Sequence, residues 1–257
     1  MRQELAILLW ALALALLTIP IYAVRRRHLG PDPLAAEERG SFVLGSFLRD
    51  WFYWFLGPAV RLSLATGLSP LFWNLTGVGF GTAAGVAFAF GRPALAGWAV
   101  LLGGVADILD GRVARCHRMA SRRGAFLDST LDRFAEFAAF VGLAVRFGGA
   151  PVGLAFVVAA LGGSLLVSYA RARGESVGIL CKLGVMQRAE RLMLLGFGAI
   201  LDGTVSAIWP NAPWADAVGG VLLVPVLAVI AVGTVGTAVF RTVWIARRLP
   251  ALDPPGS

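Results

Sequence analysis

Seven stretches of about 20 apolar residues dominate this chain, and each is long enough to cross a bilayer as a helix. They cover residues 5–24, 69–91, 93–115, 125–147, 149–170, 186–202 and 217–245. The chain is 58% hydrophobic and only 15% charged, which is typical of a polytopic membrane protein and not of a soluble domain. Because lipid cannot pair backbone polar groups, we predict an all-α, polytopic membrane helix bundle.

Four aspartates interrupt this apolar pattern where the third and fourth stretches meet. Asp107 and Asp110 close one stretch, a basic loop follows at 116–123, and Asp128 and Asp132 lie near the start of the next stretch. At about 100° per residue, Asp107 and Asp110 share one helix face, and Asp128 and Asp132 share another. The two stretches form an antiparallel hairpin, so we expect the four carboxylates to meet.

A metal centre is the natural explanation of four such acids. Each charge in a bilayer costs about 2.5–3.5 kcal/mol, so the cluster needs compensation. Hard divalent cations take oxygen ligands, and two ions between two carboxylate pairs would also hold phosphate oxygens. We therefore expect two Mg²⁺ ions, with Mn²⁺ as the alternative ion. The rival explanation is a buried Asp–Arg network that joins helices, but such a network does not require acids on two facing stripes.

Small residues stand between the acids. Gly111 and Ala114 share the face of the first two aspartates, and Gly124 begins the second helix. Residues without bulk let a flat or charged ligand approach the helix backbone. The acidic face is therefore predicted to bind a ligand as well as ions.

The complete spacing D-x2-D-G-x2-A-R-x8-G-x3-D-x3-D resembles the signature of the CDP-alcohol phosphatidyltransferases. The resemblance runs roughly from Ser69 to Arg241. It implies that a phosphatidyl group passes from CDP-diacylglycerol to an alcohol, with release of CMP. It also implies a homodimer and a six-helix core, to which this chain adds one N-terminal transmembrane helix. The matching residues are Asp107, Asp110, Gly111, Ala114, Arg115, Gly124, Asp128 and Asp132.

The resemblance also implies roles for these residues. Asp107, Asp110 and Asp128 would hold the ions, and Asp132 would be the catalytic base while also contacting a metal. Arg115 would pair with a phosphate, which suits a forked guanidinium. The small residues Gly111, Ala114 and Gly124 would border the cytidine.

Thr76 is a further expected contact to the CDP-lipid. The family often has a Pro-Asn-x-Thr-like pattern at this place, whereas here Asn74 stands four residues after Pro70. Hydrogen bonding between helices is an equal alternative for Thr76.

The acceptor alcohol is predicted from the basic stretch Ser168–Leu195. This stretch resembles the SYxKARAE-like and ERPERL-like runs of bacterial phosphatidylinositol-phosphate synthases, with departures at Gly174 and at 187–189. A phosphorylated acceptor, inositol phosphate or glycerol phosphate, would need such a basic cluster. An unphosphorylated alcohol is the alternative acceptor. The alternative role for the arginines is to anchor the helix ends among the lipid headgroups. The expected acceptor ligands are Arg171, Arg173, Arg188 and Arg191.

Basic residues predict the orientation, since all 23 Lys and Arg except Arg2, Arg92 and Arg146 fall on one side of the spans. The positive-inside rule makes that side cytoplasmic, so the site would open to the cytoplasm at a bacterial-type inner membrane.

Residues 45–67 mix aromatics with charge and predict an amphipathic interfacial helix, broken or bent at Pro58. An eighth span is the alternative for this segment.

The expected domains are an anchor and linker at 1–44, a transferase domain at 45–249 and a tail at 250–257.

Two rival functions would also explain the four signature aspartates: a divalent-cation transporter and a non-catalytic lipid-binding scaffold. The acids lie at one end of the hairpin only, whereas a transporter also needs an exit. A net charge of +8 fits anionic membrane lipids and polyphosphate ligands, and nothing in the sequence indicates nucleic acid.

Overall fold

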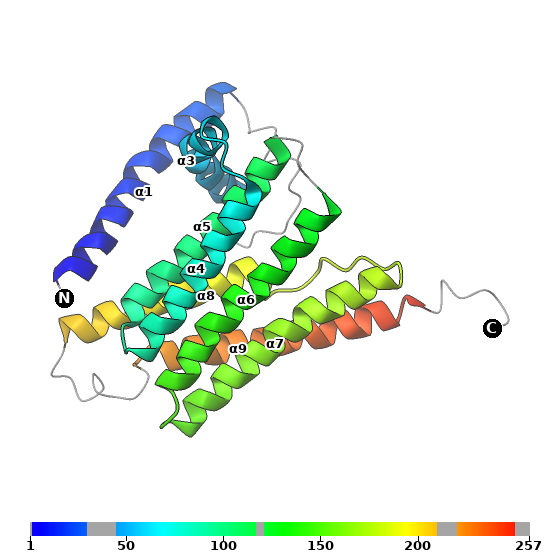
Figure 1. The fold of residues 1–257 in the computed structure, drawn as a ribbon. Helices are drawn as coiled ribbons and strands as arrows, with labels where there is room; N and C mark the ends of the chain where they lie inside the picture. The colour runs from blue at the N-terminus through cyan, green and yellow to red at the C-terminus, as the bar shows by residue number, and fades with distance from the viewer. Residues whose placement is uncertain (1, 30–44, 117–120, 210–219, 250–257) are drawn as a thin grey trace. The chain divides into compact units, whose positions relative to one another are not determined.

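The computed structural model describes residues 2–29, 45–116, 121–209 and 220–249, and within these ranges all regular secondary structure is helical (Figure 1). The all-α prediction is therefore confirmed. The predicted linker and tail, and residues 117–120 of the basic loop, lie outside the described residues. The helices are α1 (Arg2–Leu29), α3 (Gly45–Ala65), α4 (Pro70–Ala89), α5 (Pro93–Cys116), α6 (Arg122–Arg146), α7 (Pro151–Ser176), α8 (Arg188–Ile208) and α9 (Leu223–Ala246).

Six helices of the described part are long and apolar enough to cross a membrane, namely α1, α4, α5, α7, α8 and α9. The remaining predicted span corresponds to α6, whose 25 residues would reach about 37 Å. This helix is long enough to cross a membrane, but its acids and arginines make it less apolar than the other six. The predicted amphipathic helix is α3, and it continues through Pro58, so the proline does not end it.

Prolines and glycines set the helix boundaries. Pro70, Pro93 and Pro151 open their helices, where the missing N–H is not needed. Gly67 and Gly91 both have a φ of 69°, which lets the chain turn sharply after α3 and α4. The turn at Gly91 is closed by a hydrogen bond of 2.8 Å from the next backbone N–H to the carbonyl of Ala87.

The chain divides into two compact units. The first comprises residues 1–79 and 103–132, and the second comprises 80–102 and 133–257. In the first unit, Leu56 and Val60 of α3 pack against Leu109 of α5. This contact joins α3 to the helix that carries the first two signature aspartates. The predicted domain boundaries fall at the edges of segments that are not described, and they stay predictions.

In the second unit, α4 and α6 approach so closely that their backbones touch. A Cβ atom on Gly142 would overlap the backbone of Gly85, and one on Gly85 would overlap the carbonyl of Ala138. Small residues are what allow membrane helices to pack at this separation. Next to this crossing lies a core of apolar side chains that includes Phe88 and Leu143.

We expect Gly142→Ala to lower the unfolding temperature of the purified protein, because the added methyl group meets backbone atoms and not a flexible side chain. Overpacking of this kind costs about 1–3 kcal/mol. The matched control is Gly162→Ala on α7, where a Cβ atom meets nothing within 4 Å. Equal unfolding temperatures for the two variants would contradict the close α4–α6 crossing.

Candidate functional site

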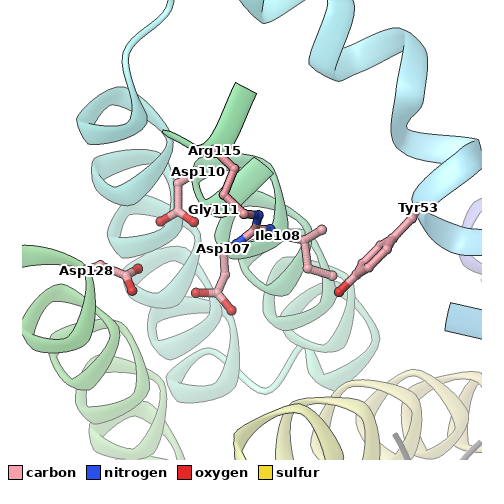
Figure 2. Close-up of a pocket in the computed structure, with 7 residues that line it drawn as sticks. All are labelled: Tyr53, Asp107, Ile108, Asp110, Gly111, Arg115 and Asp128. Carbon is pink, nitrogen blue, oxygen red and sulfur yellow. The ribbon is translucent and has the colours of Figure 1, made fainter. Parts of the chain in front are cut away.

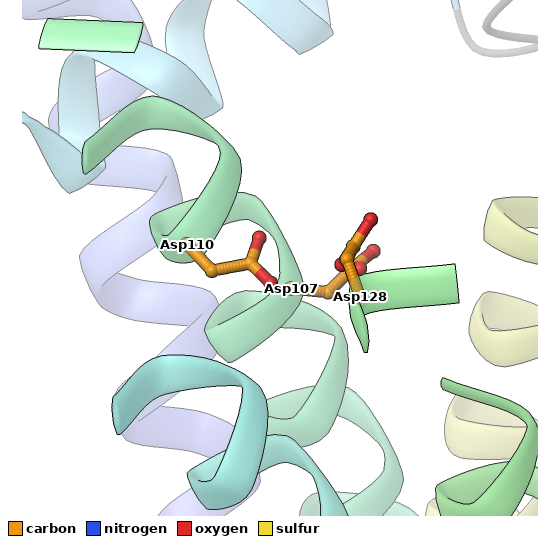
Figure 3. Close-up of side chains that lie close together, drawn as sticks. All are labelled: Asp107, Asp110 and Asp128. Atoms are coloured by element: carbon orange, nitrogen blue, oxygen red, sulfur yellow. The ribbon is translucent and has the colours of Figure 1, made fainter. Parts of the chain in front are cut away.

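Helices α5 and α6 bring three of the four signature aspartates together. Asp107, Asp110 and Asp128 each offer a carboxylate oxygen, and these oxygens lie within 4.8 Å of one another (Figure 3). Asp132 lies one turn further along α6, half-buried, and is close enough to Asp110 to interact with it electrostatically. The expected meeting of the hairpin faces is therefore seen at these three carboxylates, with the fourth nearby.

The three carboxylates fit a divalent ion. Mg²⁺ holds oxygen ligands at about 2.0–2.1 Å, so opposite ligands are about 4.2 Å apart. The observed limit of 4.8 Å between the carboxylate oxygens is only slightly wider than this distance. Asp110 is 4% exposed, and its Oδ2 atom has no hydrogen-bond partner among the described residues. A buried carboxylate oxygen without a donor is costly, and a cation would remove that cost.

A pocket of about 250 Å³ opens at these acids (Figure 2). Sites for drug-sized molecules measure about 300–1,000 Å³, so this pocket has room for a small polyanion and its ions, or for the anionic part of a larger ligand. Its lining residues are Tyr53, Asp107, Ile108, Asp110, Gly111, Arg115 and Asp128.

Gly111 makes room for Arg115. A Cβ atom on Gly111 would lie 3.3 Å from Nη1 and 3.4 Å from Nη2 of Arg115. Figure 2 shows the Arg115 side chain reaching back along α5 over Gly111, toward Asp107. The glycine therefore lets a guanidinium, a suitable donor to phosphate, lie beside the acids.

The other small residues lie elsewhere. Neither Ala114 nor Gly124 is among the described residues that line the pocket. The backbone N–H of Gly124 donates to Oγ of Ser121 at 3.0 Å, which caps the start of α6. The hydroxyl of Thr76 donates to the carbonyl of Phe72 at 2.8 Å, within α4. Contacts of these residues to a nucleotide stay predictions.

Three of the four arginines expected to bind the acceptor reach the surface of the second unit. Arg171 is exposed and pairs with Glu175 at 2.9 Å. Arg173 is exposed and donates to Oγ of Ser176 at 3.4 Å. Arg188, at the start of α8, is half-buried.

Arg191 lies in a different environment. It is 3% exposed, and its Nε and Nη2 atoms donate to the two carboxylate oxygens of Glu136 at 2.9 and 3.2 Å. A third hydrogen bond, from Nη1, reaches the carbonyl of Met186 at 3.3 Å. In this structure Arg191 therefore fixes α8 to α6, and its expected contact to the acceptor stays a prediction.

Sequence reasoning missed three residues with clear roles. Glu136 continues the acidic stripe of α6 by one further turn, a spacing that could have revealed it. Arg241 is 3% exposed and donates to the carbonyls of Leu183 and Val167, so it holds the segment between α7 and α8. Tyr53 was treated only as an interfacial aromatic, yet it lines the pocket.

Comparison with known proteins identifies the family of this chain. The family model for CDP-alcohol phosphatidyltransferase matches residues 72–209, which include all eight signature positions. A phosphatidylinositol phosphate synthase of Streptomyces avermitilis is 33% identical over 86% of this chain and 93% of its own. The enzyme of the same name from Mycobacteroides abscessus is 34% identical over 70% of this chain and 84% of its own.

Solved structures show the same fold. The phosphatidylinositol phosphate synthase of Mycobacterium tuberculosis with CDP-DAG bound has a TM-score of 0.64 and 28% identity, over 78% of this chain and 98% of that one. A second structure of that enzyme, with manganese and citrate, has a TM-score of 0.62 and 30% identity, over 73% and 88% of the two chains. The present chain is an integral membrane enzyme, and it belongs to the CDP-alcohol phosphatidyltransferase family.

Proposed function

We propose that this enzyme transfers the phosphatidyl group of CDP-diacylglycerol to inositol phosphate and releases CMP. The observation that carries the proposal is the convergence of Asp107, Asp110 and Asp128 at one pocket. The names of the relatives support the acceptor, since the two synthases described above are named for phosphatidylinositol phosphate. They favour inositol phosphate over glycerol phosphate, the other phosphorylated acceptor that fits the basic stretch.

We assign the binding of divalent ions to Asp107, Asp110 and Asp128, with Mg²⁺ as the proposed ion. Bound there, divalent ions would withdraw charge from the diphosphate and stabilise the leaving CMP. The structure of the mycobacterial enzyme in complex with manganese supports the use of a divalent metal. A transporter or a lipid-binding scaffold, the two rival functions, would not account for membership of an enzyme family.

The remaining roles belong to side chains of this chain. In the reaction, the acceptor hydroxyl oxygen bonds to the lipid-side phosphorus, and the bond from that phosphorus to the CMP oxygen breaks. Asp132 takes the hydroxyl proton as general base. Arg115, which lies over Gly111, holds a phosphate oxygen.

Three features of the proposal rest on the sequence and the resemblance. These are the homodimer, the placement in a bacterial-type inner membrane and the opening of the site to the cytoplasm. The distribution of Lys and Arg supports the last of them. All three stay predictions.

Loss of one metal-binding carboxylate should abolish turnover. We expect Asp107→Asn, Asp110→Asn and Asp128→Asn each to reduce CMP release on the order of 100-fold or more, because a bound ion contributes several kcal/mol to such a reaction. Chelation of divalent ions should do the same in the native enzyme, and added Mg²⁺ should restore it. Ser129→Ala, an exposed neighbour on α6, is the control and should retain activity. Near-normal turnover of any Asn variant without metal would contradict the assignment.

Asp132→Asn should separate binding from chemistry. If Asp132 is the base, kcat falls by about 100- to 10,000-fold. Binding of CDP-diacylglycerol, measured by isothermal titration in detergent, should stay close to that of the native enzyme. A loss of binding as large as that of Asp107→Asn would instead make Asp132 chiefly a metal ligand.

Arg171 is the arginine best suited to test the acceptor site, because it is exposed and its removal spares the core. We expect Arg171→Ala to raise the KM for inositol phosphate about tenfold or more, with CDP-lipid binding unchanged. The control is Arg247→Ala, which removes an exposed arginine beyond α9 and so tests the effect of losing an arginine that only contacts lipid headgroups. An equal KM in both variants, or a native preference for unphosphorylated inositol, would contradict the acceptor assignment.

Arg191→Ala needs a different design. It leaves Glu136 buried without its partner, and breaking a buried ion pair costs about 3–5 kcal/mol. Its activity is therefore to be compared with that of the double variant Glu136→Gln, Arg191→Gln, which removes both charges. A raised acceptor KM in a stable double variant would assign acceptor binding to Arg191 in addition to its ion pair.

A further inference from the structure

One wall of the pocket comes from outside the region that matches the family. Tyr53 belongs to α3, whereas the family match begins at residue 72. Figure 2 shows the tyrosine ring extending from α3 with its hydroxyl end nearest to Ile108 of α5. Tyr53 and the signature residues of the pocket all belong to the first unit.

The composition of the pocket gives Tyr53 a chemical role. Three of the seven lining side chains are carboxylates, and Ile108 and Gly111 offer no polar side-chain atom. Arg115 and Tyr53 are thus the lining residues whose side chains can donate hydrogen bonds at neutral pH. A phosphate oxygen that does not coordinate a metal ion needs such hydrogen-bond donors.

The ring is held by an arginine that does not line the pocket. Arg112 of α5 is 7% exposed, and its Nη1 atom donates to the backbone carbonyl of Tyr53 at 2.7 Å. Its guanidinium carbon also lies 5.0 Å from the centroid of the Tyr53 ring. This cation–π contact occupies one ring face, and Figure 2 shows the hydroxyl end of the ring pointing toward the other lining residues.

Helix α1 holds α3 from another direction. Asp50 of α3 is 2% exposed and forms ion pairs with Arg26 of α1 at 3.3 Å and with Arg49 at 3.0 Å. The indole N–H of Trp51 donates to the hydroxyl of Thr18 on α1 at 3.3 Å. With contacts to both α1 and α5, α3 presents Tyr53 from a fixed position.

We propose that Tyr53 is a substrate-binding residue whose hydroxyl donates a hydrogen bond to a phosphate oxygen of the CDP-lipid diphosphate. Arg112 positions it, and α1 supports the helix that carries it. This inference rests on the proposed function, because it takes the CDP-lipid as the ligand of the pocket. It assigns a binding role to a segment that the signature does not include.

The test is Tyr53→Phe, which keeps the ring and its contact with Arg112 but removes the hydroxyl. A hydrogen bond to a charged group is expected to be lost, so kcat/KM for CDP-diacylglycerol should fall about 10- to 100-fold. The KM for inositol phosphate should not change. Tyr22→Phe on α1, where the ring stacks 5.6 Å from the rings of Phe47 and Trp54, is the matched control and should behave as native.

Native kinetics and native CDP-diacylglycerol binding in Tyr53→Phe would overturn the inference. Loss of binding in Tyr53→Leu alongside that result would show that the ring alone forms the wall. The native enzyme is assayed in parallel, and failure of native protein to release CMP would contradict the proposed function instead.

Discussion

Mutual repulsion of carboxylates at one end of an apolar hairpin is the constraint on which the rest of the site depends. Asp107, Asp110 and Asp128 of the helices α5 and α6 place carboxylate oxygens within 4.8 Å of one another. Three like charges at this separation destabilise the folded state unless protons or cations compensate them. An enzyme that acts on a diphosphate can use this repulsion, because the same cations then hold the substrate.

The other acids that are buried within the described residues show what structural carboxylates look like. Glu136 is paired with Arg191 through two hydrogen bonds, and Asp50 is paired with Arg26 and Arg49. Asp202 accepts hydrogen bonds from two backbone N–H groups at the start of α9. Each of these acids has a donor within the protein, whereas Asp110 faces other acids. This contrast is the main physical reason to separate the metal centre from the ion pairs that only join helices.

The sequence predicted those features that follow from local patterns. The apolar stretches gave the helices, and the i, i+3 and i, i+4 spacings placed the aspartates on facing stripes, which the structure bears out for Asp107, Asp110 and Asp128. Partners distant along the chain were not predictable in this way. Glu136 and Arg191 are 55 residues apart, so the basic stretch around Arg191 suggested a ligand site and not a buried ion pair.

The role of small and aromatic residues also depended on packing. Gly111 is expected to border a nucleotide, and it lines the pocket, but its closeness to the Arg115 guanidinium is a contact that only the side-chain conformation reveals. Tyr53 lies more than 50 residues before the signature, and only the packing of α3 against α5 brings it to the pocket. Composition alone assigned that aromatic segment to the membrane interface.

The central claim is that the three carboxylates bind divalent ions, and anomalous diffraction from crystals grown with Mn²⁺ would test it most directly. The account predicts manganese peaks between Asp107, Asp110 and Asp128, and their loss in Asp110→Asn crystals. Absence of manganese at this position at saturating concentration, or peaks confined to other parts of the protein, would contradict the account.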